Sequence, residues 1–150
     1  MTTSRPERPV RVGRAAFRRF IPVATRWADN DVYGHVNNVQ YYAYFDTAVN
    51  QALIEAGLLD IEQSRVVGLV VETSCTYFES LRFPDRIEIG LAMERLGGSS
   101  LTYRIGVFKA DAPLCAAVGR FVHVYVDRAT QRPVPLTDAL RTYAEGLVVA

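Results

Sequence analysis

Apolar and polar side chains alternate near the start of the chain, between Ala16 and Trp27. Phe17, Ile21 and Val23 fall on the same parity, and a period of two predicts a β-strand with one buried face. Pro22 interrupts this pattern, and its missing backbone N–H prevents it from pairing on both sides. We therefore expect an edge strand or a strand that bulges near its middle.

The next apolar pattern repeats every three or four residues and predicts one long helix over Val39–Ala56. This stretch contains no proline or glycine, and Asn38 and Gly57 are suitable capping residues at its two ends. Only a narrow strip of the helix is polar, which is typical of a helix wrapped by the rest of its domain. The repeating apolar positions are Tyr42, Phe45, Val49, Leu53 and Ala56.

Four further strands and a short terminal helix are expected after the long helix. Glycine, proline and aspartate clusters separate the strands, and connections this short favour antiparallel neighbours, so we expect a four-stranded meander. Val67, Leu69 and Val71 share one face, which we expect to lie against the helix. The expected strands are Val66–Phe78, Arg86–Leu96, Leu101–Lys109 and Leu114–Val126, and the terminal helix is Leu136–Leu147.

The order of these elements predicts an α+β fold. A doubly wound parallel sheet is excluded because it needs a helix between successive strands. What remains is a curved five-stranded antiparallel sheet wrapped around one long central helix. Such a sheet has two open edges, and a second copy of the chain could close them, so we predict a homodimer at minimum.

Composition indicates one ordinary globular domain over residues 1–150, with residues 1–14 as a flexible arm. The net charge of +1 gives no general attraction to nucleic acid, and no apolar run approaches the roughly 20 residues of a membrane span. The N-terminus has no secretory apolar region. Cys75 and Cys115 lack partners at metal-ligand spacing, which favours reduced core thiols in a cytoplasmic protein over a catalytic cysteine.

The candidate chemistry lies between Thr25 and Asn38, immediately before the long helix. A carboxylate that acts on a carbonyl needs a group that polarises the carbonyl, and the free N–H groups of a helix N-terminus can supply it. Asp31 and the helix start near Asn38 are the two candidate halves of this device.

Several neighbours have structural explanations that compete with functional ones. Asp29 is expected to hold the loop through backbone or Arg26 hydrogen bonds, and His35 to orient the loop rather than to transfer a proton. Asp46 is expected to pair with a tyrosine or an amide. No metal site is expected, because His123 lies in a different strand and no further ligand has suitable spacing.

The sequence from Arg26 to Asp46 also resembles a family signature. It reads Arg-Trp-Ala-Asp-Asn-Asp-Val-Tyr-Gly-His-Val-Asn-Asn-Val-Gln-Tyr-Tyr-Ala-Tyr-Phe-Asp, and it is similar to the motif of hotdog-fold acyl-CoA thioesterases of the 4-hydroxybenzoyl-CoA thioesterase family. Further similarity lies at Phe83-Pro-Asp-Arg-Ile-Glu-Ile, Gly98-Ser-Ser-Leu-Thr-Tyr and Val126-Asp-Arg-Ala-Thr-Gln-Arg-Pro-Val-Pro. The resemblance implies the hotdog fold and hydrolysis of an acyl-CoA to a free acid and coenzyme A.

The resemblance also implies roles for individual residues. Asp31 would be the nucleophile or general base, backbone amides near Asn38 would polarise the thioester, and His35 would belong to the same site. The family's site lies at a dimer interface, so strand residues of the partner subunit would line the acyl pocket. The implied substrate-binding residues are Tyr33, Gly34, Asn37, Val66, Val67, Gly68, Ser99 and Ser100.

The resemblance leaves the substrate and some alternatives open. It implies no metal or redox cofactor, a homodimer or a dimer of dimers, and no nucleic-acid or membrane partner. The acyl group is not defined, and an acyl carrier protein could replace coenzyme A. Arginines could bind the coenzyme A phosphates, although solvated surface residues are the simpler reading. A non-hydrolytic acyl-thioester binding protein is the competing function, and a hotdog dehydratase fits less well. The arginines are Arg65, Arg82, Arg128 and Arg132.

Overall fold

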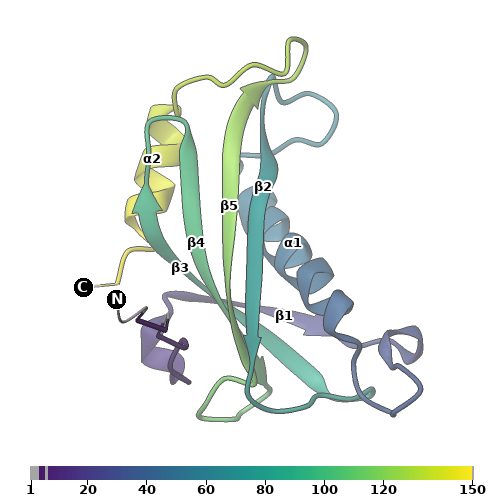
Figure 1. Cartoon of the computed structure of the whole chain (residues 1–150). Coiled ribbons are helices and arrows are strands. Elements are labelled where there is room, and N and C mark those ends of the chain that lie inside the picture. The colour runs from purple at the N-terminus through teal and green to yellow at the C-terminus, as the bar shows by residue number, and fades with distance from the viewer. Residues whose placement is uncertain (1–3, 6, 150) are drawn as a thin grey trace.

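The computed structural model describes residues 4, 5 and 7–149 as one curved sheet with a long helix behind it (Figure 1). The strands are β1 (Arg19–Ala24), β2 (Val66–Tyr77), β3 (Arg86–Leu96), β4 (Ser100–Lys109) and β5 (Ala117–Asp127). The helices are α1 (Asn38–Glu55) and α2 (Asp138–Glu145), with short 3-10 helices η1 (Arg14–Ala16) and η2 (Trp27–Asp29) on either side of β1. The two 3-10 turns make β1 shorter than expected.

All strand pairs are antiparallel, and the strand order is β1-β3-β4-β5-β2. The expected four-stranded meander is therefore wrong, because β2 pairs with β5 and β1 occupies the free edge of β3. The connection over residues 78–85 makes this possible. It must cross about 14 Å, the width of three strand spacings, whereas eight extended residues reach about 27 Å.

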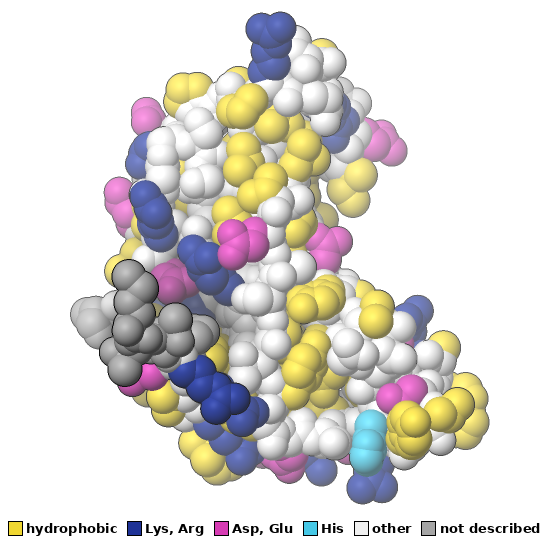
Figure 2. Space-filling view, viewed as in Figure 1, with side chains coloured by type: hydrophobic (Ala, Val, Ile, Leu, Met, Phe, Trp, Pro, Cys, Tyr) yellow, Lys and Arg dark blue, Asp and Glu magenta, His cyan; other side chains and the backbone are white. Residues whose placement is uncertain are grey.

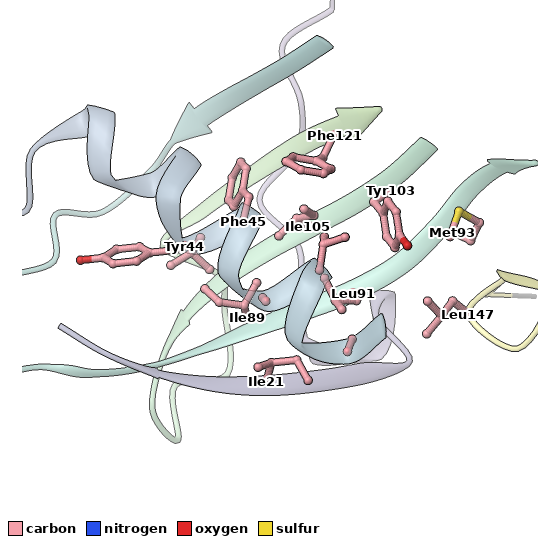
Figure 3. Close-up of a cluster of buried hydrophobic side chains, with 14 of the residues drawn as sticks. Ile21, Tyr44, Phe45, Ile89, Leu91, Met93, Tyr103, Ile105, Phe121 and Leu147 are labelled. Atoms are coloured by element: carbon pink, nitrogen blue, oxygen red, sulfur yellow. The ribbon is translucent and has the colours of Figure 1, made fainter. Parts of the chain in front are cut away.

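The core lies between the inner face of the sheet and α1, and α2 covers β3 at one end. Phe45 projects from α1 toward the strands that carry Ile105 and Phe121 (Figure 3). Its ring lies over Gly119, where an added Cβ would come within 2.4 Å of the ring and 2.6 Å of the Ser74 carbonyl oxygen. The absence of a side chain at Gly119 lets the helix approach the sheet at this point.

The expected inner face of β2 is wrong. Leu69 and Val71 are 40% and 60% exposed, and Gly68 faces the core instead, directly beside the buried ring of His123. A register shift between Val70 and Glu72 accompanies this exposed apolar stretch. β2 is an edge strand, so its outer ladder groups are unpaired in the single chain.

Part of the expected N-terminal arm is held against the sheet. The Cys115 N–H donates a hydrogen bond to the Val12 carbonyl oxygen at 3.0 Å. Arg11 Nε donates to the Cys115 carbonyl oxygen at 2.8 Å. Residues 11 and 12 of the expected arm thus contact the segment before β5, while residues 1–3 and 6 of that expectation lie outside the described residues.

This arrangement confirms the expected α+β class and the hotdog architecture, in which five antiparallel strands curve around one long helix. Among the described residues, no helix is long and apolar enough to cross a membrane.

Gly119→Ala tests the close contact between α1 and the sheet. The added methyl group meets both the Phe45 ring and the Ser74 carbonyl, so we expect the free energy of unfolding to fall by about 1–3 kcal/mol. Urea titration measures this change. Gly98→Ala is the control, because an added Cβ there has no atom within 4 Å, and equal losses in both variants would contradict the packing argument.

Candidate active site

The loop between β1 and α1 is closed by its own backbone. Asn30 and Val36 form an antiparallel bridge, and the Asn37 N–H donates to the Asp29 carbonyl oxygen at 2.9 Å. Within this loop the Asp31 N–H donates to the His35 carbonyl oxygen at 2.8 Å. The loop therefore has a defined shape, and Asp31 lies near its narrow base rather than at its tip.

Asp29 anchors this loop to α1. Its side chain is fully buried, and it accepts hydrogen bonds from the Tyr44 hydroxyl at 2.6 Å and from the Arg26 N–H and Nε, each at 2.9 Å. Burial alone would raise the pKa of Asp29, but the hydrogen bonds from Tyr44 and Arg26 and the Arg26 charge hold it below its ordinary value. Asp29 is thus an ionised structural carboxylate, which confirms its expected bonding to Arg26.

Asp31 lies two residues further along and is only half-buried. Its Oδ1 accepts hydrogen bonds from the Tyr33 N–H at 2.9 Å and, at 3.4 Å, from the His35 N–H. These bonds form the Asx turn that a loop aspartate commonly makes. Oδ2 accepts no hydrogen bond from the described residues, so one oxygen holds the loop and the other remains available for a ligand.

The start of α1 differs by one residue from the expectation. Asn37, not Asn38, is the N-cap, because its Oδ1 accepts from the Val39 N–H at 3.0 Å and its carbonyl accepts from the Gln40 N–H at 2.9 Å. The Asn38 N–H makes no hydrogen bond with the described residues. It is therefore the first free donor at the positive end of the helix dipole.

Asp31 and Asn38 line the same pocket, which has a volume of about 370 Å³. Tyr41 and Tyr77 also line it, and the sequence did not point to either residue as part of the site. The Tyr77 hydroxyl donates to the Asn38 carbonyl oxygen at 3.1 Å and so fixes the first peptide of the helix. Burial raises the pKa of Tyr41 to about 12, so its hydroxyl stays protonated at neutral pH. The lining residues are Asp31, His35, Val36, Asn38, Tyr41, Tyr77, Phe78, Glu79 and Ser80.

The other expected substrate-binding residues fall into two groups. Tyr33, Gly34 and Asn37 belong to the loop beside the pocket, and Gly34 has the positive φ of 77° that its turn requires. The second group lies at the other end of the sheet. Val66 is eleven residues from Tyr77 along β2, which corresponds to about 35 Å. One chain alone therefore does not bring the second group to Asp31; that group is Val66, Val67, Gly68, Ser99 and Ser100.

Several side chains with competing interpretations have structural contacts. Asp46 accepts from the Asn50 amide at 3.1 Å, as expected for pairing with an amide. Arg128 donates to the Glu62 carbonyl oxygen at 2.7 Å, so it braces the loop before β2. Burial raises the pKa of Cys75 to about 11, which disfavours a reactive thiolate. Among the described residues, no group of three or more His, Cys, Asp or Glu side chains could hold a metal ion.

Comparisons with known proteins agree with the fold and with the expected family. The family model of the thioesterase-like superfamily matches residues 25–142. The crystal structure of the PA5185 protein from Pseudomonas aeruginosa is 50% identical, covers 94% of this chain and 99% of its own, and has a TM-score of 0.91. Slr0204, a 1,4-dihydroxy-2-naphthoyl-CoA thioesterase from Synechocystis, is 18% identical with a TM-score of 0.74 and covers 83% of this chain and 93% of its own. The YsmA protein of Bacillus subtilis is 24% identical over 130 residues, which is 87% of each chain.

The five-stranded sheet, the long central helix and the loop that carries Asp31 define a hotdog-fold protein of the thioesterase type. The chain belongs to the thioesterase-like superfamily, whose model covers the candidate pocket, α1 and the strands β2 to β5.

Tyr44→Phe tests the anchor beneath the candidate site. The variant removes one donor from a buried carboxylate, so we expect a loss of about 1–3 kcal/mol in the free energy of unfolding at pH 7. Tyr42→Phe is the matched control, because the Tyr42 hydroxyl makes no hydrogen bond with the described residues. Chemical denaturation that finds the two variants equally stable would argue against the Asp29 anchor.

Proposed function

We propose that this protein hydrolyses an acyl-CoA thioester to a free carboxylic acid and coenzyme A. The observation that carries the proposal is the shared pocket of the Asp31 carboxylate and the Asn38 N–H, each with an unused polar atom. A thioester carbonyl between them would meet a carboxylate at its carbon and a donor at its oxygen. Membership of the thioesterase-like superfamily supports the reaction class.

In the proposed reaction the Asn38 N–H stabilises negative charge on the thioester oxygen in the transition state, and the helix dipole strengthens this effect. As a nucleophile, Asp31 attacks the carbonyl carbon and expels the coenzyme A thiolate, and water then hydrolyses the anhydride that results. As a general base, Asp31 instead removes a proton from a water molecule that attacks the carbon, and the C–S bond breaks to release the coenzyme A thiolate, which takes up the proton. In either mechanism, hydrogen bonds between the His35 backbone and Asp31 hold the loop in place. The reaction requires no metal or redox cofactor, and we expect it to take place in the cytoplasm.

We propose further that two copies pair along β2. Three consecutive residues of this edge strand, Leu69, Val70 and Val71, are 40%, 45% and 60% exposed. The other edge is β1, which has six residues and contains Pro22, so it offers a shorter and interrupted ladder. Antiparallel pairing of the two β2 strands would cover the apolar stretch and join the sheets.

This pairing would also complete the acyl site. If the two-fold axis passes near Val70, residues 66–68 of the second copy lie opposite residues 72–74 of the first. Position 74 is three residues, or about 10 Å, from Tyr77 at the candidate pocket. The pairing thereby accounts for the expected roles of Val66, Val67 and Gly68, which a single chain places far from Asp31.

Asp31→Asn is the variant that tests the proposed chemistry. Losing a general base or nucleophile should lower kcat/KM by about 10²–10⁴, measured as thiol release across a panel of acyl-CoA substrates. Asp46→Asn changes an exposed carboxylate on α1 and should keep wild-type activity. Near wild-type activity of Asp31→Asn would exclude the mechanism. Saturable acyl-CoA binding without thiol release by the wild type would favour the binding protein instead.

Val71→Asp tests the proposed pairing of β2. A charge in the centre of the joined edge should convert the dimer to a monomer at micromolar concentration and lower the activity with it. Sedimentation velocity measures the change in mass. Val10→Asp provides the control, since Val10 is 74% exposed in the N-terminal segment, and an unchanged dimer in Val71→Asp would show that β2 is not the interface.

A further inference from the structure

A second hollow lies on the outer face of the sheet, opposite α1. Figure 2 views this outer face, on which positive and negative side chains meet near the middle. The groove has a volume of about 500 Å³, larger than the pocket of Asp31, and shares no lining residue with it. Its size lies within the range of small-molecule sites. Its lining includes residues from both ends of the chain, namely Val10, Val148 and Val149.

The charges in this groove are unevenly compensated. Arg104 and Arg120 are direct partners in the β4–β5 register, a placement in which like charges repel. Arg120 binds Glu72 at 2.9 Å and Glu94 at 3.4 Å. Arg104 forms no ion pair among the described residues, although its side chain is half-buried. The Arg104 guanidinium lies over the Phe17 ring, with 6.0 Å between Cζ and the ring centroid. The groove therefore holds one guanidinium that no carboxylate of the described residues neutralises.

The surroundings of Arg104 leave space for a ligand beside it. In the register of the sheet, Ala92 on β3 lies beside Arg104, and Ser74 on β2 lies beside Arg120. Small side chains therefore flank the pair of arginines on both sides. Ser74 and Thr76 add hydroxyl groups to the lining. Val118 and the valines from the two ends of the chain supply apolar surface. One end of a ligand would thus meet a charged donor and the rest would meet hydrocarbon.

We propose that this groove is a binding site for a carboxylate with an apolar body, separate from the catalytic pocket. A guanidinium matches the geometry of a carboxylate and can bind it through two N–H groups. A singly charged anion suits the site better than a phosphate dianion, because Glu94 also lines the groove and repels additional negative charge. The apolar walls select an acid with a hydrocarbon body over a small hydrophilic anion.

Octanoate is a suitable probe, and backbone amide shifts in NMR titrations of the intact protein locate its binding. We expect saturable shifts at Ser74, Ala92 and Val118 that Arg104→Gln weakens at least about tenfold. Arg86→Gln removes an exposed charge at the start of β3, outside the groove, and should leave these shifts unchanged. Thermal unfolding of both variants confirms that the fold is intact.

Ser74→Phe tests the groove without altering its charges, because a large ring at this exposed position should occupy the space and abolish the shifts. Octanol lacks the carboxylate and inorganic phosphate lacks the hydrocarbon body, so each should bind at least about tenfold more weakly than octanoate. Equal octanoate binding by the wild type and Arg104→Gln would overturn the proposal. It would also be overturned if shifts appeared only around Asn38, or if sedimentation showed a second copy covering the groove in place of octanoate.

Discussion

The buried negative charge of Asp29 is the constraint on which the candidate site depends. A carboxylate in the interior is costly unless hydrogen bonds and an opposite charge compensate it. Here Tyr44 supplies a bond from α1, and Arg26 supplies both a bond and a charge from the chain before η2. The requirement to satisfy this one group therefore fixes the loop against the helix, and with it the distance between Asp31 and the helix N-terminus.

The same arrangement explains why the two aspartates of the loop differ. Asp29 uses both oxygens for internal bonds, whereas Asp31 uses Oδ1 in a turn and keeps Oδ2 free of bonds with the described residues. At the helix start, the Asn37 side chain occupies the Val39 N–H and leaves the Asn38 N–H open. One acceptor and one donor thus remain unused on the two sides of a pocket, and these are the groups that acyl transfer requires.

The sequence was sufficient for the helix, the strands and the loop motif, because each depends on local periodicity and on capping residues. β3 has its expected bounds, Arg86–Leu96, and Gly57 has the positive φ expected just after α1.

Strand order was not predictable in this way, since a connection long enough to cross the sheet does not define which strand the next one pairs with. The face of β2 was misassigned for a related reason. The alternation of apolar Leu69 and Val71 fits a strand whether these side chains pack in the core or lie exposed on an edge strand that a second chain could cover. Tyr77 was missed because its contact with Asn38 joins positions 39 residues apart.

In the proposed reaction, Asp31 and the Asn38 amide act on the same carbonyl group. A crystal structure of the Asp31→Asn variant with a bound acyl-CoA tests this geometry. We expect the thioester oxygen to lie about 2.7–3.1 Å from the Asn38 nitrogen and the carbonyl carbon to face the side chain at position 31. A thioester bound away from the start of α1, with the Asn38 N–H directed at another group, would contradict it.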